Sequence, residues 1–578
     1  MSNWTQIGSD FNGQSAYDQL GYSVSLSDDG SVVAIGLTGE DNNGGESGSV
    51  LIYQNNSGTW TQIGEINGEA NSDGSGSSVS ISGDGSIVAI GAYGNDDNGT
   101  SSGHVRIYQN NSGTWTKIGD DIDGEAAYDY SGYSVSLSDD GSIVAIGAYG
   151  NDDNGTSSGH VRIYQNNSGT WTKIGDDIDG EAAYDEFGKS VSLSGDGSVV
   201  AIGAPRNDNV VNGVEYGTST GHVRIYKNVD GTWAQMLDYN GYGGDIYGEF
   251  KYDNSGTSVS LSDDGSIVAI GAPYNDGGIS WDTYSNSNNK GHVRVYQFSE
   301  STTRSSPGAI AGNWSQIGSD IEGDRRDFSG SSISLSGDGS YLAINGAPRD
   351  DFTTYVKIYK NDSGTWTQIG ETIEGSWSEQ SVSLSDDGSI VAIGAYGDDS
   401  NGTDTGNVRI FQGDITPPTV SSVTSSTADG TYTVEDAIFI SVNFSESVDV
   451  DTLFYYPYLQ LDTGSTSRNA NYASGSGSST LVFKYNVQSG DAASDLDYRS
   501  TSALSLSNAT IQDSAGHNAI LTLPELNSSN SLAGSSALVI DTTAPTISGV
   551  TSSTADGSYK VGDSISISVA FSESVDVV

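Results

Sequence analysis

Four of the five histidines stand at the same place in a repeated phrase, where they could serve acid–base or metal chemistry. His104, His160, His222 and His292 each precede Val-Arg. Further copies of the phrase carry Ser49, Tyr355 and Asn407 at this position. A catalytic centre needs dissimilar groups that converge, and a catalytic histidine is not normally copied from repeat to repeat. We therefore expect these histidines to have a structural or surface role.

The acidic phrase DIDGEA is a second group with chemical potential, and one copy contains Asp177, Asp179 and Glu181. A carboxylate pair could act as acid and base in a polysaccharide-active enzyme. However, residues 84–129 return unchanged at 140–185, so the phrase is duplicated with its surroundings. The sequence also has no Ser-His-Asp order, no H-E-x-x-H and no phosphate loop. We expect an acidic loop and no catalysis, with the enzyme as the alternative.

Aromatic residues gather in three long insertions, at 205–221, 238–256 and 274–291. Flat aromatic faces interleaved with Asp and Asn suit sugars or protein partners, because they combine apolar area with hydrogen bonds. The predicted binding residues are Tyr216, Tyr242, Tyr247, Trp281 and Tyr284. The alternative is that these loops pack on themselves.

The composition excludes several classes of partner. The net charge is -53, from 75 Asp and Glu against 22 Lys and Arg, which repels nucleic acid and anionic membranes. The chain has no cysteine, hence no disulfide, thiolate metal site or Cys nucleophile. No apolar run is long enough to span a membrane. Such acidity with many short β-type runs favours an extracellular or cell-surface protein, since salt screens the self-repulsion.

The elements that must position these residues come from repetition. Copies of SVSLS and SIVAIGA, joined by DDG or GDG, predict a hairpin. A second hairpin follows, from HVRIYQ through NNSGT to WTKIG. The first hairpins begin at Ser23, Ser78, Ser134, Ser190, Ser258, Ser332 and Ser381, and the Trp strands begin at Trp4, Trp60, Trp115, Trp171, Trp233, Trp314 and Trp366.

This order predicts a closed ring. One Trp strand precedes all the other strands, so the chain supplies seven sets of four only if that first strand completes the last set. A β-propeller closes in this way, by pairing the two ends of the chain within one blade. We expect a seven-bladed propeller over 1–413, with an open solenoid as the alternative.

The phrases GYSVSLSDDGSIVAIGA, GHVRIYQ and FGKSVSLSGDGSVVAIGAP resemble the FG-GAP repeat of integrin-α-like propellers. That family often carries a calcium loop of the form D-x-[DN]-x-D-G-x-x-D. Asp140 and Gly141 match its fifth and sixth positions, but Ser136, Ser138 and Val144 occupy ligand positions. Too few oxygen ligands remain for calcium. We therefore expect DDG to be turn chemistry and do not transfer the family's calcium sites.

A different pattern begins after Gln412. Two near-copies, each containing VTSSTADG, start at Asp414 and Asp541, and Pro418 to Pro545 gives a period of 127 residues. Predicted strands at 419–424, 437–444, 457–462, 480–487, 509–513, 519–523 and 537–541 indicate a β-sandwich. This region resembles the tandem Ig-like repeats of bacterial adhesins. We expect an Ig-like sandwich over 414–540 and a truncated second repeat over 541–578, with a natural chain that continues.

Acidic residues predict calcium at the domain junctions. If the sandwich strands alternate in direction, Glu446 lies beside Asp414, and Asp513 approaches Asp541 and Glu573. Clustered carboxylates repel one another, and a hard cation with oxygen ligands relieves that repulsion. The alternative is that these carboxylates simply stay solvated.

Taken together, these patterns predict an extracellular or cell-surface binding and adhesion protein, with a propeller head on an Ig-like stalk. We expect the partner to be a carbohydrate or a protein on a surface. The alternatives are a structural component of a surface layer, fibre or virion, and a polysaccharide-active enzyme that uses the propeller face.

Overall fold

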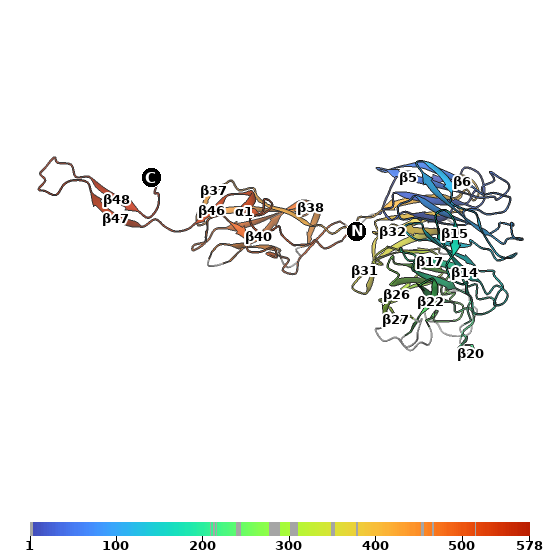
Figure 1. Cartoon of the computed structure of the whole chain (residues 1–578). Coiled ribbons are helices and arrows are strands. Elements are labelled where there is room, and N and C mark those ends of the chain that lie inside the picture. The colour runs from blue at the N-terminus through green and yellow to red at the C-terminus, as the bar shows by residue number, and fades with distance from the viewer. Residues whose placement is uncertain are drawn as a thin grey trace. The chain divides into compact units, whose positions relative to one another are not determined.

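The computed structural model describes residues 4–208, 210–211, 214–215, 217–238, 244–276, 289–300, 310–347, 353–376, 380–451, 456–464, 467–514 and 516–577. These residues form many antiparallel sheets and one short helix, so the all-β prediction is confirmed. The chain divides into two compact units, Met1–Ile415 and Thr416–Val578. Figure 1 shows the sheets of the first unit packed side by side, in colours from blue to yellow.

The strands of the first unit follow the repeats. The first repeat contains β3 (Leu20–Leu26), β4 (Val32–Leu37), β5 (Ser49–Asn56) and β6 (Thr59–Asn67). The second contains β7 (Ser78–Ile81), β8 (Ile87–Ala92), β9 (His104–Asn111), β10 (Thr114–Lys117) and β11 (Ile122–Asp123). The third contains β12 (Ser134–Leu137), β13 (Ile143–Ala148), β14 (His160–Asn166), β15 (Trp171–Lys173) and β16 (Ile178–Asp179). The fourth and fifth contain β17 (Ser190–Leu193), β18 (Val199–Ala204), β21 (His222–Val229), β22 (Thr232–Asp238) and β23 (Ile246–Tyr247); and β24 (Ser258–Leu261), β25 (Ile267–Ala272), β26 (His292–Glu300), β27 (Ile310–Gln316) and β28 (Ile321–Glu322).

The last two repeats contain β29 (Ile333–Leu335), β30 (Tyr341–Gly346), β31 (Thr353–Asp362) and β32 (Thr365–Ser376); and β33 (Gln380–Leu384), β34 (Ile390–Ala395) and β35 (Asn407–Gln412). The N-terminal strands β1 (Thr5–Gln6) and β2 (Phe11–Asn12) both pair antiparallel with β35. Two further strands, β19 (Val210–Val211) and β20 (Val214–Glu215), form a small hairpin after β18. The fourth and fifth repeats share one sheet, because β22 and β27 pair in parallel.

The predicted hairpin within each repeat is present. In the third repeat Ser134 pairs with Gly147 and Leu137 pairs with Val144. The turn is held by Asp140, whose carboxylate accepts hydrogen bonds from the Ser142 amide and the Ser138 hydroxyl, both at 2.8 Å. Burial alone would raise the pKa of Asp140, but these hydrogen bonds hold it below its usual value. The interpretation of DDG as turn chemistry is therefore confirmed.

The alternating serines of SVSLS connect consecutive repeats. The Ser80 hydroxyl accepts a hydrogen bond from the Leu137 amide at 2.9 Å, and Ser136 does the same for Leu193 at 3.0 Å. Equivalent bonds occur between every pair of consecutive repeats and also from the Leu26 amide to Ser383, which links the first repeat to the seventh. The serine side chains thus satisfy amides that would otherwise stay unpaired at a sheet edge.

The DDG and GDG turns are joined by a second set of hydrogen bonds between main-chain groups. The Asp28 amide donates to the Gly83 carbonyl at 3.0 Å, and the Gly83 amide donates to the Asp139 carbonyl at 2.8 Å. The series continues through Gly195, Asp263, Gly337 and Asp386. The Asp386 amide then donates back to the Asp28 carbonyl at 2.9 Å. The seven turns are therefore connected in a cycle of hydrogen bonds.

The hydrophobic core lies between neighbouring repeats. Ile87 and Val105 of the second repeat pack with Val135 and Val144 of the third, and all four are buried. Burial of an aliphatic side chain of this size stabilises the fold by about 1.5 to 3 kcal/mol. The Trp171 indole adds a polar link, because it donates to the Ile118 carbonyl of the preceding repeat at 3.0 Å. The repeats are thus held together mainly by the apolar side chains on the faces that pack against each other.

The second unit contains β36 (Val420–Ser425), β37 (Gly430–Tyr432), β38 (Ala437–Asp451), β39 (Tyr458–Asp462), β40 (Arg468–Ser474), β41 (Ser478–Asn486), β42 (Ala492–Ala493), β43 (Asp497–Tyr498), β44 (Leu504–Ser505), β45 (Thr510–Gln512), α1 (Leu532–Ser535), β46 (Leu538–Asp541), β47 (Ile547–Ser552) and β48 (Ile567–Phe571). An eight-stranded sheet has the order β36-β38-β41-β40-β39-β43, with β44 and β45 beside it, and β37, β46 and β42 form a second sheet. Buried residues of both sheets make one core.

One strand prediction in this unit was wrong, and another was too short. Residues 519–523 form no strand, because the amides of Ala519, Ile520 and Leu523 bond to three separate segments and share no ladder. The strand predicted at 437–444 runs on to Asp451, first beside β41 and then beside β45. A register shift between Asn443 and Val448 lets β38 change partners. Glu446 therefore lies within a strand.

Candidate functional site

Each of the four histidines that precede Val-Arg is the first residue of a strand and is fully buried, so a surface role is excluded. His104 pairs across β9 and β11 with Asp123, and His160 pairs with Asp179. The residue before His160 has to be glycine. Gly159 has a φ of 76°, and a Cβ on it would lie 2.0 Å from the Phe187 carbonyl oxygen. The local backbone thus directs the imidazole into the space between two repeats.

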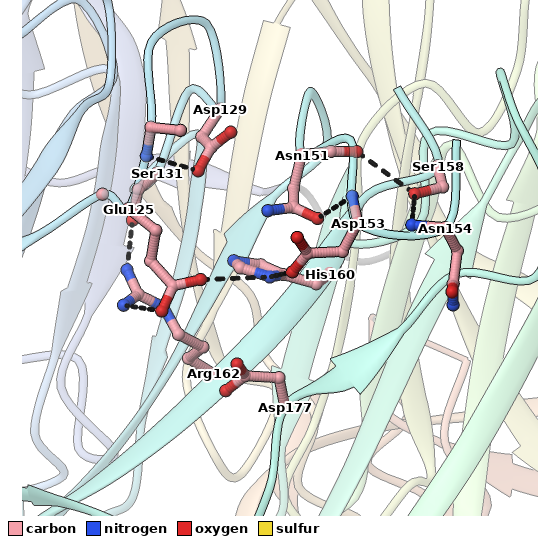
Figure 2. A network of polar contacts seen from close by, with 12 residues as sticks. Glu125, Asp129, Ser131, Asn151, Asp153, Asn154, Ser158, His160, Arg162 and Asp177 are labelled. Atoms are coloured by element: carbon pink, nitrogen blue, oxygen red, sulfur yellow. Dashed lines mark hydrogen bonds and ion pairs between the residues drawn. The ribbon is translucent and has the colours of Figure 1, made fainter. Parts of the chain in front are cut away.

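Carboxylates surround the imidazole of the third repeat, as Figure 2 shows. The His160 Nδ1 lies 3.9 Å from a Glu125 oxygen and 4.0 Å from an Asp153 oxygen. Asp177 and Asp179 also reach this place, in two groups with His160 whose ligand atoms lie within 4.8 Å of one another. The second repeat repeats this arrangement around His104 with Glu69, Asp97, Asp121 and Asp123. We call these two sets the His104 cluster and the His160 cluster.

The loop before the histidine positions Asp153 through its own hydrogen bonds. The Asn151 side chain accepts from the Asp153 amide at 3.0 Å, and the Ser158 hydroxyl donates to the Asn151 carbonyl at 3.2 Å. The Asn154 amide donates to Ser158, and its side chain donates to the Gly180 carbonyl at 2.9 Å (Figure 2). The phrase NDDNGTSSG therefore forms a compact loop that presents Asp153 to the imidazole.

An arginine two residues after each histidine joins the same network. Arg162 lies 3.5 Å from Glu125 and donates to the Asp123 carbonyl of the preceding repeat at 2.7 Å (Figure 2). In the fourth repeat Arg224 instead makes two hydrogen bonds to Asp245, at 2.7 and 3.0 Å. These guanidinium groups offset part of the negative charge between repeats.

Burial lowers the pKa of His104 and of His160 to about 4, and the neighbouring Arg106 or Arg162 acts in the same direction. Both imidazoles are therefore neutral at neutral pH. Neither ring nitrogen of His104 or His160 has a hydrogen-bond partner among the described residues. A buried neutral imidazole without a hydrogen bond has the properties of an available ligand.

Comparison with known proteins bears on these repeats. Residues 60–108, 122–164 and 178–219 match the family described as FG-GAP repeat. The chain contains FG-GAP repeats. The matched segments include Asp97, His104, Asp123, Asp153, His160 and Asp179, whereas Asp121 and Asp177 lie just before the second and third segments. No curated protein matches the chain.

Solved structures with propeller folds have a low identity to the chain. The β-propeller domain of the Trilobed protease from Pyrococcus furiosus is 11% identical, with a TM-score of 0.35, over 64% of this chain and 90% of that one. Sqt1 from Saccharomyces cerevisiae is 11% identical, with a TM-score of 0.37, over 84% and 100%. A candidate 6-phosphogluconolactonase from Bacteroides uniformis is 12% identical, with a TM-score of 0.40, over 61% and 85%.

A second acidic group lies at the connected turns of the first unit. Asp28, Asp139, Asp263 and Asp386 are the first acids of DDG, and Gly83, Gly195 and Gly337 alternate with them. A Cβ on Gly337 would lie 1.9 Å from an Asp386 oxygen, so only glycine leaves room for the carboxylates. Burial and then repulsion from Asp386 raise the pKa of Asp263 to about 7. We call these four residues the turn carboxylates.

A shallow cleft of about 360 Å³ lies between the second and third FG-GAP repeats. Its lining combines Tyr164 and Trp171 with Asp120, Asp121 and Asp123. Two of these acids also belong to the His104 cluster. The cleft therefore offers aromatic surface and carboxylates at one place.

The predicted binding residues lie mostly outside the described residues. Tyr216, Tyr242, Trp281 and Tyr284 belong to that undescribed set. Tyr247 is described and is half-buried in β23. Its hydroxyl donates to Asp245 at 2.9 Å, and its ring contacts the His222 ring edge-on. Tyr247 therefore supports the fourth repeat from within, and its role in binding stays a prediction.

The residues predicted to bind calcium have varied surroundings. Asp513 is buried and accepts from the His517 amide at 2.9 Å, and its other oxygen lies 2.8 Å from the His517 ring. Asp541 accepts from the Thr543 amide. Asp414 is exposed, and Glu446 and Glu573 are half-buried. Sequence reasoning missed the Asp513–His517 pair, although the spacing of four residues is visible in the sequence. Calcium binding at these residues stays a prediction.

Proposed function

We propose that the seven FG-GAP repeats form a closed seven-bladed propeller that binds a partner outside the cell, with Ig-like domains as its stalk. The cycle of turn hydrogen bonds and the pairing of β1 with β35 support the closed ring. The two packed sheets of the second unit support an Ig-like sandwich. Among the described residues, no helix has the length and apolar character needed to cross a membrane.

The observation that carries binding as the function is the repetition of one polar arrangement. Asp97, His104, Asp121 and Asp123 recur as Asp153, His160, Asp177 and Asp179 because they lie in identical segments, and each cluster adds one Glu. A catalytic centre needs one place where unlike groups converge, whereas repeated sites suit a multivalent contact with a repetitive partner. The cleft lined by Tyr164 and Trp171 adds a surface that fits a sugar ring. We therefore favour a carbohydrate over a protein as the partner.

A polysaccharide-active enzyme is the second candidate function. Asp177 and Asp179 lie beside His160, and Glu181 lies beside His222 with Asp245. These carboxylates thus belong to two clusters in neighbouring repeats. A structural component that assembles into a layer, fibre or virion is the third candidate, since stacked β modules also suit assembly.

The proposed function is tested by incubating the full chain with immobilised algal and bacterial polysaccharides. We expect saturable capture, no release of reducing sugar and a monomer by light scattering. The Trp171→Ala variant tests the cleft, and the pair Trp281→Ala and Tyr284→Ala tests the predicted loops. Each removes a stacking face worth about 0.5 to 1.5 kcal/mol, so capture weakens about twofold to twelvefold per ring. The loop pair should keep the melting temperature, whereas Trp171→Ala should also lower it, because the indole donates to Ile118 and packs between two repeats, so its capture is compared well below that temperature. Turnover of the polysaccharide, or spontaneous high-order assembly without capture, would favour the second or the third candidate.

A further inference from the structure

The His104 and His160 clusters contain unsatisfied groups that face one another. The nitrogens of both imidazoles are buried and have no hydrogen-bond partner among the described residues, and the same holds for one Asp123 oxygen. The His160 Nδ1 lies 4.0 Å from an Asp153 oxygen, which is too long for a hydrogen bond. Two atoms that share one metal ion, each about 2.1 Å from it, lie about 3 to 4.2 Å apart. The spacing therefore fits an ion between the groups.

The first repeat offers an internal comparison, because it has the same backbone without the histidine. Ser49 occupies the place of His104, and it pairs with Asn67 where His104 pairs with Asp123. Asn42 occupies the place of Asp97. The Asn42 side chain donates to the Asn67 side chain at 3.0 Å, so two amides satisfy each other directly. Without the histidine, the places of Asp97 and Asp123 are thus held by uncharged side chains that bond to each other, and Asn42 also donates to Glu65 at 3.4 Å.

The seventh repeat shows the same joint change. Asn407 replaces the histidine, its partner across the strands is Asn12, and the Asn407 side chain donates to the Asn12 side chain at 3.0 Å. Ser400 occupies the place of Asp97. In the first and seventh repeats the histidine and both carboxylates are thus replaced together by uncharged groups, whereas in the fourth repeat His222 is kept and faces Tyr247.

Two carboxylates that face each other cannot satisfy each other by a direct hydrogen bond as the two amides do. Asp97 and Asp123 are both acceptors when ionised, so they repel each other unless a proton or a cation lies between them. Arg106 does not fill this role for them, because its closest carboxylate contact is Glu69 at 3.3 Å. The second and third repeats therefore keep two carboxylates and an imidazole at positions that carry uncharged side chains in the first and seventh repeats.

We propose that Asp97, His104 and Asp123 bind one first-row divalent transition ion such as Zn²⁺ or Mn²⁺, and that Asp153, His160 and Asp179 bind a second. The three groups of each set lie within 4.8 Å of one another. An imidazole nitrogen with two carboxylates favours such ions over Ca²⁺ and Mg²⁺, which prefer oxygen ligands alone. Three protein ligands leave positions open for water or for a hydroxyl of a bound partner. The sites differ in place and in ligand type from a calcium loop at the DDG turn.

The test counts bound Mn²⁺ on the full chain by the electron paramagnetic resonance signal of the free ion. The decisive variant is Asp123→Asn with Asp179→Asn, which copies Asn67 and Asn12 into the two clusters. Its matched control is Asp120→Asn with Asp176→Asn, two exposed acids of the same connections outside both clusters. Both variants lose the same charge, so non-specific attraction of cations is equal. We expect the decisive variant to bind two Mn²⁺ fewer per chain than the control.

A second variant covers the case in which the first one fails to fold. His104→Ser with His160→Ser copies Ser49, leaves the charge at pH 7 unchanged and is expected to lose the same two ions. At a Zn²⁺ concentration of 100 times the dissociation constant, each occupied site stabilises the folded state by about 2.7 kcal/mol. Zn²⁺ should therefore raise the melting temperature of the wild type more than that of either cluster variant. Equal Mn²⁺ numbers in the decisive variant and its control would overturn the proposal. Retention of both ions by the serine variant would overturn the imidazole as a ligand.

Discussion

At the scale of single residues, the first unit shows how position decides what an aspartate does. Asp263 and Asp264 are neighbours in one DDG turn. Asp264 accepts hydrogen bonds from the Ser266 amide and the Ser262 hydroxyl, which hold its pKa low although burial acts in the other direction. Asp263 instead faces Asp386, and burial and that repulsion raise its pKa. One acid stabilises the turn, and the other destabilises the fold when it ionises.

This contrast predicts a pH dependence of opposite sign for the two residues. Burial and the repulsion from Asp386 raise the pKa of Asp263 from its ordinary value of 3.8 to about 7, so the folded state binds more protons between these pH values. Stability therefore falls as the pH rises from about 4 to about 7. Asp263→Asn removes this loss, and we expect its melting temperature at pH 8 to exceed that of the wild type by about 1 to 3 °C. At pH 4.5 the melting temperatures of the Asp263→Asn variant and the wild type should agree.

The control for this prediction is Asp264→Ala, measured in the same buffers by thermal unfolding. It removes two hydrogen bonds of the turn, each worth about 1 kcal/mol, and we expect a lower melting temperature at both pH values. A wild-type stability that is flat between pH 4.5 and 8, or a destabilised Asp263→Asn variant at pH 8, contradicts the role assigned to the turn carboxylates.

At the scale of elements, the serine hydroxyls between repeats make a specific prediction. Ser80→Ala removes the acceptor of the Leu137 amide and leaves a backbone donor unpaired at a half-buried position. We expect the unfolding free energy to fall by about 1 to 3 kcal/mol. Thr114→Ala, at an exposed position of β10, is the control and should change it by less than about 0.5 kcal/mol. Equal effects in chemical denaturation would mean that the serine contact contributes no stability.

Local patterns in the sequence predict the hairpins, because turn residues and strand periodicity act within one repeat. The hydrogen bonds between repeats, such as that from Leu137 to Ser80, depend on how two repeats pack, so alternation alone does not reveal them. The same holds for β38, whose register shift comes from two different neighbours. The His160 cluster could have been anticipated in part, since the histidine and the acidic phrase DIDGEA recur together in the second and third repeats. Its geometry needs Glu125 from the preceding connection and Asp153 from a loop, which no single window of sequence joins.

At the scale of the whole molecule, one duplicated unit accounts for both the fold and the candidate sites. A single repeat in isolation would expose to water the two apolar faces that it packs against its neighbours, so its stability requires both neighbours. In the proposed closed ring no such face stays open, and the pairing of β1 with β35 joins the two ends of the first unit. The identical segments 84–129 and 140–185 then place equivalent clusters in neighbouring repeats. Duplication thus multiplies a binding arrangement without a new fold.

The absence of cysteine makes closure directly measurable. Thr5 and Gln412 are exposed and directly opposite in the β1–β35 pairing. In the double variant Thr5→Cys with Gln412→Cys, a disulfide would bridge the two ends of the ring. The control is Thr5→Cys with Gln54→Cys, since Gln54 holds the place of Gln412 in the first repeat.

The most direct test of the account is the yield of intramolecular disulfide after mild oxidation of these two variants, measured by mass spectrometry on dilute protein. The closed ring predicts near-complete cross-linking between the two introduced cysteines of the first variant, with a melting temperature raised because a very long loop is closed, and little cross-linking in the control. Equal yields in the two variants, or dimers in place of the internal bond, would contradict the closed ring.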